Sequence, residues 1–212
     1  MSTAPRAVLF DMDGVLVRSF EVWFRVVEEA GRRFRGRAIS REEFTPTFGQ
    51  GTAADVPAFG LSCTTEELDR FYAEEFTRHL DQIWVDPHAV PALTGLRARG
   101  VRVGLVTNTV QVLTEAILTS AGLRGHLDAI SCADMVARAK PAPDLVQHAL
   151  TALGVSAAEA WMVGDSKYDR EAARAAGVHF VGYGIDGDRR VETLTGLLDL
   201  VRGLSGAQPL VQ

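Results

Sequence analysis

Residues 7–15 constrain the fold more than any other stretch, because an apolar run ends there in two carboxylates and a glycine. The four residues before Asp11 are apolar and suit a buried strand, and Gly14 suits a turn just past its end. Asp11 and Asp13 lie two residues apart, so on an extended chain they project to the same side. Two carboxylates that close repel each other and do not both stay ionised without a cation or an ammonium group nearby. The stretch therefore indicates a metal site or an acid/base pair, or else only a strand that ends in turn-forming Asp and Gly residues.

Predicted strands alternate with predicted helices from about residue 84 onward. The predicted strands are 101–106, 129–132, 161–163 and a last one at 178–181, and the predicted helices are 88–99, 111–121, 144–153 and 169–176. Such alternation indicates a parallel sheet with helices on both faces. We therefore predict an α/β fold with a Rossmann-like core.

The stretch between the first strand and residue 82 has a different pattern, with amphipathic helices and no convincing strand. Its predicted features are a helix over 19–30 that stops at Gly31, a solvated basic loop over 32–37, a capping box at Ser40 and a helix over 64–80. Eight of the ten phenylalanines lie between Phe20 and Phe76, which gives this block apolar material of its own. We predict a small inserted α-helical domain at 17–81, and a core domain formed by 1–16 and 82–212.

Charge and apolar content exclude several classes of protein. The chain carries 22 Lys and Arg against 27 Asp and Glu, a net charge of −5, which gives no bulk attraction to nucleic acid or to an anionic membrane. No apolar run approaches the length that spans a bilayer, and the N-terminus leads directly into the first strand, so we expect no signal peptide. Cys63 and Cys132 match no metal-ligand spacing and are expected to be reduced thiols of a cytoplasmic protein. Lys140 and Lys167 are the only lysines, and we expect Lys167 to be exposed.

Polar side chains follow three of the predicted strands, where ligands bind in open parallel sheets. They are Asp11 and Asp13, then Thr107 and Asn108, then Asp165 and Asp169, while Lys140 comes just before a predicted helix. Taken singly, these residues suit helix caps and a solvated lysine. Taken together, the carboxylates suit Mg²⁺, and a hydroxyl, helix-start N–H groups and an ammonium suit a phosphate. The set therefore predicts phosphoryl transfer, in which an aspartate can form an aspartyl-phosphate.

In order and spacing, these residues resemble the four motifs of the haloacid dehalogenase superfamily, and in particular its phosphoglycolate-phosphatase-like branch. The motifs are Asp11-x-Asp13-Gly14, Thr107-Asn108, Lys140-Pro141 and Gly164-Asp165-Ser166-x-x-Asp169. The resemblance covers almost the whole chain and implies that the helical insert is that family's cap. One such motif is a weak signal, whereas four in register are a specific one.

The resemblance implies a catalytic role for each matching residue. Asp11 would be the nucleophile, and Asp13 the general acid that protonates the leaving group and then the base that activates water. Thr107 would hold the phosphoryl group with Asn108 beside it. Lys140 would pair with the charge of the nucleophile and the phosphate.

The resemblance also implies a Mg²⁺ site. Its ligands would be Asp11, the backbone carbonyl of Asp13 and the side chain of Asp165, with Asp169 as a partner behind the metal site. The expected substrate is a small phosphorylated metabolite, either phosphoglycolate-like or a sugar phosphate.

Two alternative functions stay open. One is a β-phosphoglucomutase-like sugar-phosphate mutase, although such relatives carry a cap histidine, whose position falls near Trp23, and a cap lysine that the insert lacks. The other is a non-catalytic phosphate-binding regulatory protein on the same scaffold. Dehalogenases work without the second carboxylate of the first motif, and phosphonate-cleaving relatives need a cap lysine. The presence of Asp13 and the lysine-free insert therefore favour hydrolysis of a phosphate monoester.

Two features depart from the pattern of the branch or leave a role open. Val15 and Arg18 stand where the branch usually has threonine and an acidic residue. Arg18 would either bind an anionic substrate or form an ion pair on the surface. Segment 49–52 would be either a cap loop that reaches the active site, with glycines that allow close approach, or a plain turn.

Overall fold

The computed structural model describes residues 4–205, and its central feature is a parallel sheet with the strand order β5-β4-β1-β6-β7-β8. The strands are β1 (Ala7–Phe10), β4 (Arg102–Val106), β5 (Ala129–Ser131), β6 (Ala160–Gly164), β7 (His179–Tyr183) and β8 (Arg189–Val191). β1 lies in the middle of the sheet, paired with β4 and β6, and all four of its residues are buried. The predicted α/β fold with a Rossmann-like core is confirmed.

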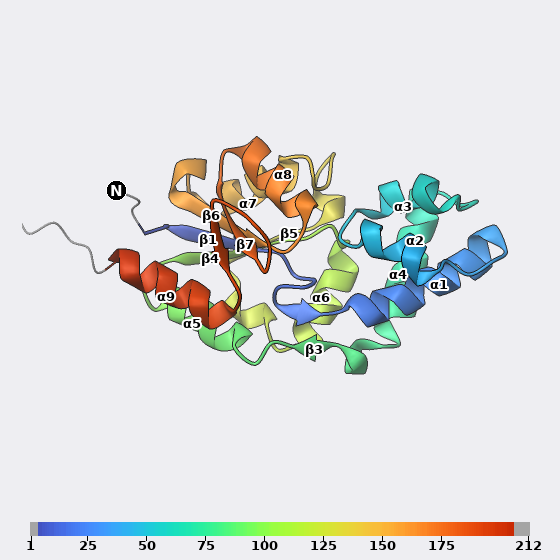
Figure 1. The fold of residues 1–212 in the computed structure, drawn as a ribbon, viewed down its shortest axis with the longest axis horizontal. Helices are drawn as coiled ribbons and strands as arrows, with labels where there is room; N and C mark the ends of the chain where they lie inside the picture. The colour runs from blue at the N-terminus through green and yellow to red at the C-terminus, as the bar shows by residue number, and fades with distance from the viewer. Residues whose placement is uncertain (1–3, 206–212) are drawn as a thin grey trace, which may run out of the picture.

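Helices cover both faces of the sheet (Figure 1). α7 (Asp144–Leu153) and α8 (Lys167–Ala176) lie on one face, and α5 (Ala89–Arg97), α6 (Gln111–Ser120) and α9 (Leu194–Ser205) lie on the other. Alternate residues of β1 supply the two cores, because Ala7 and Leu9 join the cluster under α7 and α8, whereas Val8 and Phe10 join the opposite cluster. A strand buried on both faces is apolar throughout, which accounts for the run before Asp11.

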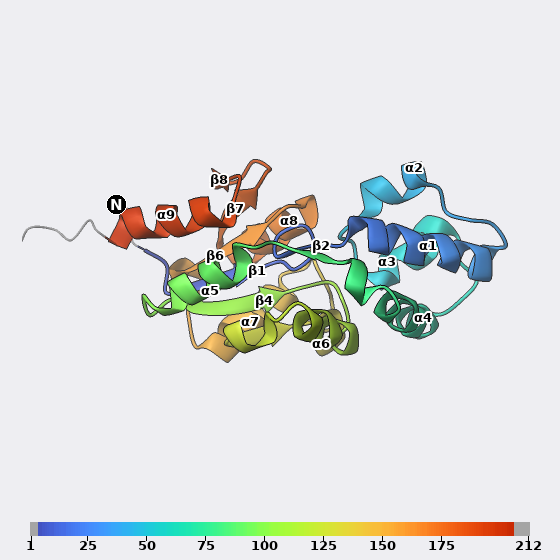
Figure 2. The same cartoon turned by 90° about the horizontal axis from the view of Figure 1, so that it is seen from below.

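The insert between β1 and β4 is mainly helical and forms one end of the elongated molecule (Figures 1 and 2). Its helices are α1 (Phe20–Arg35), α2 (Arg41–Phe44), α3 (Thr52–Phe59) and α4 (Thr65–Thr77). A short antiparallel pair, β2 (Val17–Arg18) and β3 (Trp84–Val85), forms where the chain enters and leaves the insert. The aromatic ring of Trp23 lies 5.5 Å from Tyr72 and 4.7 Å from Phe76, so α1 and α4 pack through their aromatic residues. The predicted capping box at Ser40 is confirmed.

Two local predictions in the insert are wrong. α1 does not stop at Gly31 but runs to Arg35 and ends at Gly36, whose φ of 76° closes the helix. Gly31 has a packing role instead, because a Cβ there would lie 2.7 Å from backbone atoms of the turn that follows the helix. The predicted solvated loop over 32–37 is therefore mostly helix, and the partly buried guanidinium of Arg35 lies 2.8 Å from the carboxylate of Glu43.

The predicted last strand at 178–181 is followed by two further elements, β8 and α9. β8 has only three residues, of which two are arginines, so no apolar run marks it in the sequence. It extends the sheet by pairing in parallel with β7.

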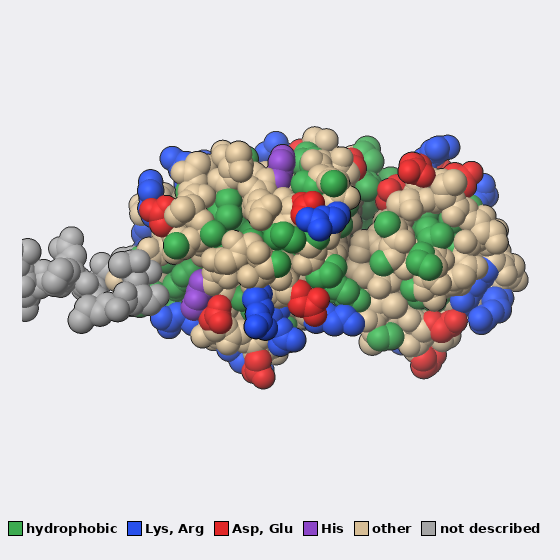
Figure 3. Space-filling view, turned by 90° about the horizontal axis from the view of Figure 1, so that it is seen from above, with side chains coloured by type: hydrophobic (Ala, Val, Ile, Leu, Met, Phe, Trp, Pro, Cys, Tyr) green, Lys and Arg blue, Asp and Glu red, His purple; other side chains and the backbone are tan. Residues whose placement is uncertain are grey.

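The surface of the molecule mixes charges of both signs. Figure 3 shows acidic and basic side chains interspersed over the face seen from above. Within residues 4–205, no helix combines the length and the apolar content that crossing a bilayer requires.

Candidate active site

Four segments bring their polar residues together beyond the carboxyl ends of the central strands. Asp11 and Asp13 follow β1, Thr107 and Asn108 follow β4, Lys140 precedes α7, and Asp165 and Asp169 lie at the junction of β6 and α8. Except for the half-buried Asp165, these side chains are buried. The structure therefore gathers all the predicted site residues except Arg18 into one place.

Lys140 is the electrostatic centre of the site. Its Nζ lies 2.7 Å from Asp11 Oδ1 and 2.7 Å from Asp169 Oδ1, and it also donates to the carbonyl of Val106 at 3.0 Å. Burial disfavours the charge on Lys140, but the two carboxylates outweigh this effect and hold the pKa of the ammonium above its usual value. Lys140 therefore stays protonated and neutralises part of the negative charge around Asp11.

Three carboxylates form a cluster that could bind a metal ion. Asp11, Asp165 and Asp169 each offer one oxygen, and these oxygens lie within 4.8 Å of one another. Burial and the neighbouring carboxylates raise the pKa of Asp165 to about 7 and that of Asp11 well above its usual value. A Cβ on Gly14 would lie 1.9 Å from Asp165 Oδ2, so only glycine lets the turn after β1 approach this carboxylate. The excess of buried negative charge and the oxygen-only donor set suit a hard divalent cation.

Asp169 has a second set of contacts that fixes its position. Its Oδ2 accepts hydrogen bonds from the N–H of Ser166 at 3.1 Å and from the Ser166 hydroxyl at 2.6 Å. Ser166 in turn caps α8 by accepting the N–H of Asp169. Asp169 therefore joins the start of α8 to Lys140.

Asp13 faces the insert and not the carboxylate cluster. Its Oδ1 accepts hydrogen bonds from the Ser19 hydroxyl and, at 3.1 Å, from the indole N–H of Trp23, and its Oδ2 accepts one from the Thr109 hydroxyl at 3.4 Å. Burial raises the pKa of Asp13, and the hydrogen bonds from these three donors and the charge of Lys140 oppose this rise. A carboxyl group in this setting can hold a proton more readily than an exposed aspartate and can return to the ionised form.

Trp23 was not predicted to act at the site, yet its indole is the only link from α1 to Asp13 among the hydrogen bonds of the described residues. We expect the Trp23→Phe variant to keep the ring packing but to lower kcat about tenfold, because a hydrogen bond to a charged group contributes about 1.5 kcal/mol. The measurement is the steady-state rate of the phosphoryl-transfer reaction that the motifs predict. The melting temperature is the control and should match that of the wild type, because the ring packing against Tyr72 and Phe76 is kept. An unchanged kcat in Trp23→Phe would contradict this role.

Thr107 and Asn108 hold different parts of the site together. The Thr107 Oγ1 accepts the N–H of Thr109 at 3.1 Å, which orients the hydroxyl at the pocket. The Asn108 amide donates to the carbonyls of Gly49 at 3.0 Å and Lys140 at 2.9 Å, and its oxygen accepts the Lys140 N–H at 2.8 Å. Both side-chain N–H groups of Asn108 are thus engaged within the protein, so the predicted contact with a phosphate would have to come from its backbone N–H.

The segment 49–52 reaches the core and lines the pocket, as the cap-loop interpretation expects. Besides the bond from Asn108, Gly49 lies against Ser166 and Tyr168, and its φ of 89° suits glycine. Gly51 lies close to Ala139 and Asn108.

Arg18 lies apart from this site. It is exposed in β2, and its guanidinium stacks over the ring of Trp84 at 4.3 Å. It does not belong to the residues that line the pocket. Lys167 is exposed, as predicted.

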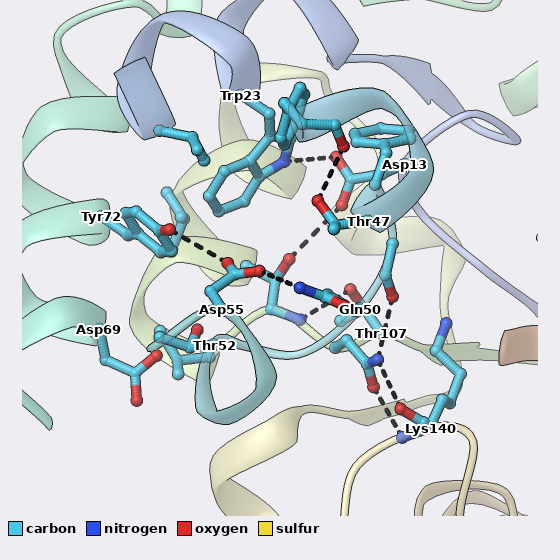
Figure 4. A pocket seen from close by; sticks show the side chains of 18 of the residues that line it. Asp13, Trp23, Thr47, Gln50, Thr52, Asp55, Asp69, Tyr72, Thr107 and Lys140 are labelled. Carbon is cyan, nitrogen blue, oxygen red and sulfur yellow. Dashed lines mark hydrogen bonds between the residues drawn. The ribbon is translucent and has the colours of Figure 1, made fainter. Parts of the chain in front are cut away.

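The pocket extends from the predicted residues into the insert (Figure 4). Its insert side is formed by side chains that the motifs did not reveal, namely Trp23, Thr47, Gln50, Thr52, Asp55, Asp69 and Tyr72. Asp55 was detectable in principle, because it is the only charged residue in the sequence of α3. The others lie on amphipathic helices or in loops, where nothing local distinguishes a pocket position from a packing position.

Comparisons with known proteins agree with this geometry. The family model described as haloacid dehalogenase-like hydrolase matches residues 8–183. The chain is 32% identical over 189 residues to the phosphoglycolate phosphatase of Rhodospirillum rubrum, a match that covers 84% of this chain and 78% of that protein.

Solved structures show the same fold. The haloacid dehalogenase phosphatase from Thermococcus onnurineus matches with a TM-score of 0.71 and 26% identity, over 93% of this chain and 98% of that chain. CbbY from Rhodobacter sphaeroides, solved in complex with phosphate, matches with a TM-score of 0.81 over 91% of this chain and 96% of that chain. At 24% identity, the second likeness concerns the fold alone.

Proposed function

The chain belongs to the haloacid dehalogenase-like hydrolases and is a phosphoric monoester hydrolase, and we propose that it is Mg²⁺-dependent and acts through an aspartyl-phosphate on Asp11. The observation that carries the proposal is the meeting of Asp11, Thr107, Lys140 and Asp165 from four separate segments at the end of β1. Such a site offers a nucleophile, donors for phosphoryl oxygens and a set of metal ligands. The substrate is a small phosphorylated metabolite.

In the first step, a carboxylate oxygen of Asp11 forms a bond to phosphorus while the bond from phosphorus to the ester oxygen breaks. Asp13 gives its proton to the departing ester oxygen, so the product leaves as a neutral alcohol. In the second step, Asp13 takes a proton from a water molecule that attacks the phosphoryl group on Asp11. Phosphate leaves, and both carboxyl groups return to their starting states. Asp13 suits both steps because burial favours its protonated form and three hydrogen-bond donors favour its ionised form.

Asp11, Asp165 and the backbone carbonyl of Asp13 would hold the Mg²⁺ ion, with Asp169 behind them. When bound, the ion would offset the charge that builds up on the phosphoryl oxygens. Lys140 contributes a second, fixed positive charge, and Asp169 keeps it pointed at Asp11. The Thr107 hydroxyl is placed to donate to a phosphoryl oxygen.

The insert would act as a cap that opens and closes, with boundaries near residues 17 and 81. The contact between Asn108 and the carbonyl of Gly49 joins the insert to the core across the pocket, so opening of the insert would break this hydrogen bond. The two-residue strands β2 and β3 lie at the two connections and are the natural place for a hinge.

We expect phosphate release from a generic aryl phosphate to require Mg²⁺ and to stop when the ion is chelated. The measurement is the rate of phosphate release with Mg²⁺, with excess chelator, and after Mg²⁺ is restored. The mutase alternative predicts instead that the phosphoryl group moves between two hydroxyls of one sugar without release. The regulatory alternative predicts phosphate binding with no turnover, and this outcome would refute the proposal.

We also propose a cytoplasmic location. The thiols of Cys63 and Cys132 are both free, which a reducing compartment maintains.

A further inference from the structure

The part of the pocket that lies under the insert is lined by carboxylates. Asp55 on α3 and Asp69 on α4 both face it, at the end opposite Lys140 (Figure 4). Among the described residues that line the pocket, Lys140 is the only one with a positive side chain. That ammonium is held between Asp11 and Asp169, so the insert side of the pocket has no cation to receive an anionic group.

Asp55 is held in a fixed orientation at this end of the pocket. It is 8% exposed, its Oδ1 accepts a hydrogen bond from Gln50 at 2.6 Å, and its Oδ2 accepts one from the Tyr72 hydroxyl at 3.0 Å. Within residues 4–205, no lysine, arginine or histidine forms an ion pair with it. Each carboxylate oxygen can accept more than one hydrogen bond, so Asp55 retains capacity for a donor from a ligand.

Burial of a carboxylate at position 55 is energetically unfavourable, which suggests that this side chain has a function besides packing. Burial raises the pKa of Asp55 to about 7, and the charge of Asp69 adds to the rise, while the hydrogen bonds from Gln50 and Tyr72 oppose it. An asparagine would fill the same volume and could still accept from Tyr72 without the cost of burying a charge. The carboxylate adds only the ability to attract donors and cations and to repel anions.

We propose that Asp55 selects the leaving group of the substrate by accepting a hydrogen bond from its hydroxyl or ammonium group and by repelling carboxylates. This inference rests on the proposed phosphatase function and narrows its substrate class to phosphate esters of small polyols or amino alcohols. The pocket volume of about 50 Å³, which the phosphate and the leaving group share, favours a small ester. The class excludes phosphoglycolate, which the name of the Rhodospirillum rubrum relative assigns to that protein.

Three substrates of nearly equal size test the proposal. Hydroxyethyl phosphate, phosphoethanolamine and phosphoglycolate share a phosphate and two carbons, and they differ only in a terminal hydroxyl, ammonium or carboxylate. We expect kcat/KM of the wild-type protein to be at least about tenfold higher for one of the first two than for phosphoglycolate, because like charges placed together disfavour binding. Comparison of kcat/KM for hydroxyethyl phosphate and phosphoethanolamine then shows whether the preferred leaving group is a polyol or an amino alcohol.

The Asp55→Asn variant changes the charge with little change in shape. We define the preference as kcat/KM for the better of the first two substrates divided by kcat/KM for phosphoglycolate. We expect the variant to reduce this ratio at least about tenfold, mainly by improving the kcat/KM of phosphoglycolate. Asp199→Asn is the matched control, because Asp199 is exposed on α9 and lies outside the pocket lining. This control variant should leave kcat/KM for all three substrates unchanged.

The pH dependence of the wild-type preference needs no variant and is a second test. Tyr72 and Asp69 on α4 and Gln50 in the loop before α3 face Asp55, and of these Asp69 also carries a charge. Asp55 ionises across neutral pH, so the preference over phosphoglycolate should rise between about pH 6 and about pH 8. Titration of the substrates themselves affects the wild type and Asp55→Asn alike, so the effect of Asp55 is the difference between their two pH profiles. The profile of Asp55→Asn should lack the rise that the ionisation of Asp55 causes in the wild type.

The outcomes separate this inference from the function on which it rests. A wild-type protein that hydrolyses phosphoglycolate as well as or better than the other two esters overturns the inference and leaves the phosphatase function standing. The same holds if an aryl phosphate is hydrolysed and none of the three is. If no ester at all is hydrolysed with Mg²⁺ present, the phosphatase function fails and the inference fails with it.

Discussion

The Asp11→Asn variant is expected to lose phosphatase activity by a factor of about 10⁴ or more, because it removes the carboxylate to which we propose that the phosphoryl group is transferred. An amide nitrogen is not nucleophilic, and the remaining amide oxygen lacks the negative charge of the carboxylate. The measurement is the single-turnover rate of phosphate release in the presence of Mg²⁺. The phosphorylated form of the wild-type protein, trapped by acid quench, should carry its phosphoryl group on Asp11.

This loss of activity should occur without loss of the fold. Burial and the neighbouring carboxylates already raise the pKa of Asp11, so removing its charge relieves repulsion within the cluster. Lys140 keeps its ion pair with Asp169 in the variant. We therefore expect a melting temperature equal to or above that of the wild type, with exposed Asp81→Asn as the control for a neutral change. Activity in Asp11→Asn equal to that of wild type would refute the assignment of the nucleophile.

The sequence was sufficient to predict that the motif residues lie together, because the topology of a parallel sheet determines where its strands end. Parallel strands carry their carboxyl ends to one edge of the sheet, so Asp11, Thr107 and Asp165 had to lie near one another once the strands were located. Lys140 follows no predicted strand, and only its resemblance to a known motif indicated that its side chain turns inward. Its buried contacts with Asp11 and Asp169 show why a lysine is required there.

The insert side of the site could not be predicted in the same way. The contacts of Trp23 with Asp13, and of Tyr72 with Asp55, depend on how separate helices pack, and helical periodicity does not determine that packing. The clamp of Asn108 on Gly49 joins residues 59 positions apart, and no local pattern indicates it. A proposal about the substrate class therefore requires the three-dimensional structure of the pocket and cannot be made from the sequence.

The Lys140→Met variant is expected to lower the free energy of unfolding by about 3–5 kcal/mol at about pH 8, because it leaves two buried carboxylates without their counter-charge. Methionine is close to lysine in length and is apolar, so the packing volume is kept. The Lys140 side chain is 2% exposed, and solvent cannot replace its ammonium group. We also expect kcat to fall at least about a hundredfold, because a fixed positive charge next to the proposed nucleophile is lost. Urea unfolding and steady-state kinetics measure the two effects.

The destabilisation of Lys140→Met should depend on pH, and the pKa of Asp11 determines whether it grows or shrinks as the pH falls. The pKa of this carboxyl group is raised in the folded protein, and removal of the ammonium raises it further. A carboxyl group whose pKa is higher in the folded than in the unfolded state costs stability as the pH rises through that range, and the cost disappears when it is protonated. The stability deficit of Lys140→Met should therefore shrink as the pH falls from about 8 to about 5.

The other lysine of the chain provides the control. Lys167 is exposed on α8, and Lys167→Met should change neither stability nor kcat by more than a small factor. Adding Asp169→Asn to Lys140→Met removes one of the two uncompensated carboxylates, so the double variant should regain part of the stability but not the activity. This difference distinguishes the two tasks that we propose for Lys140, which are to balance the charge of the buried carboxylates and to hold a positive charge against the phosphoryl group. A Lys140→Met variant as stable as the wild type at about pH 8 would contradict the first task, and an unchanged kcat would contradict the second.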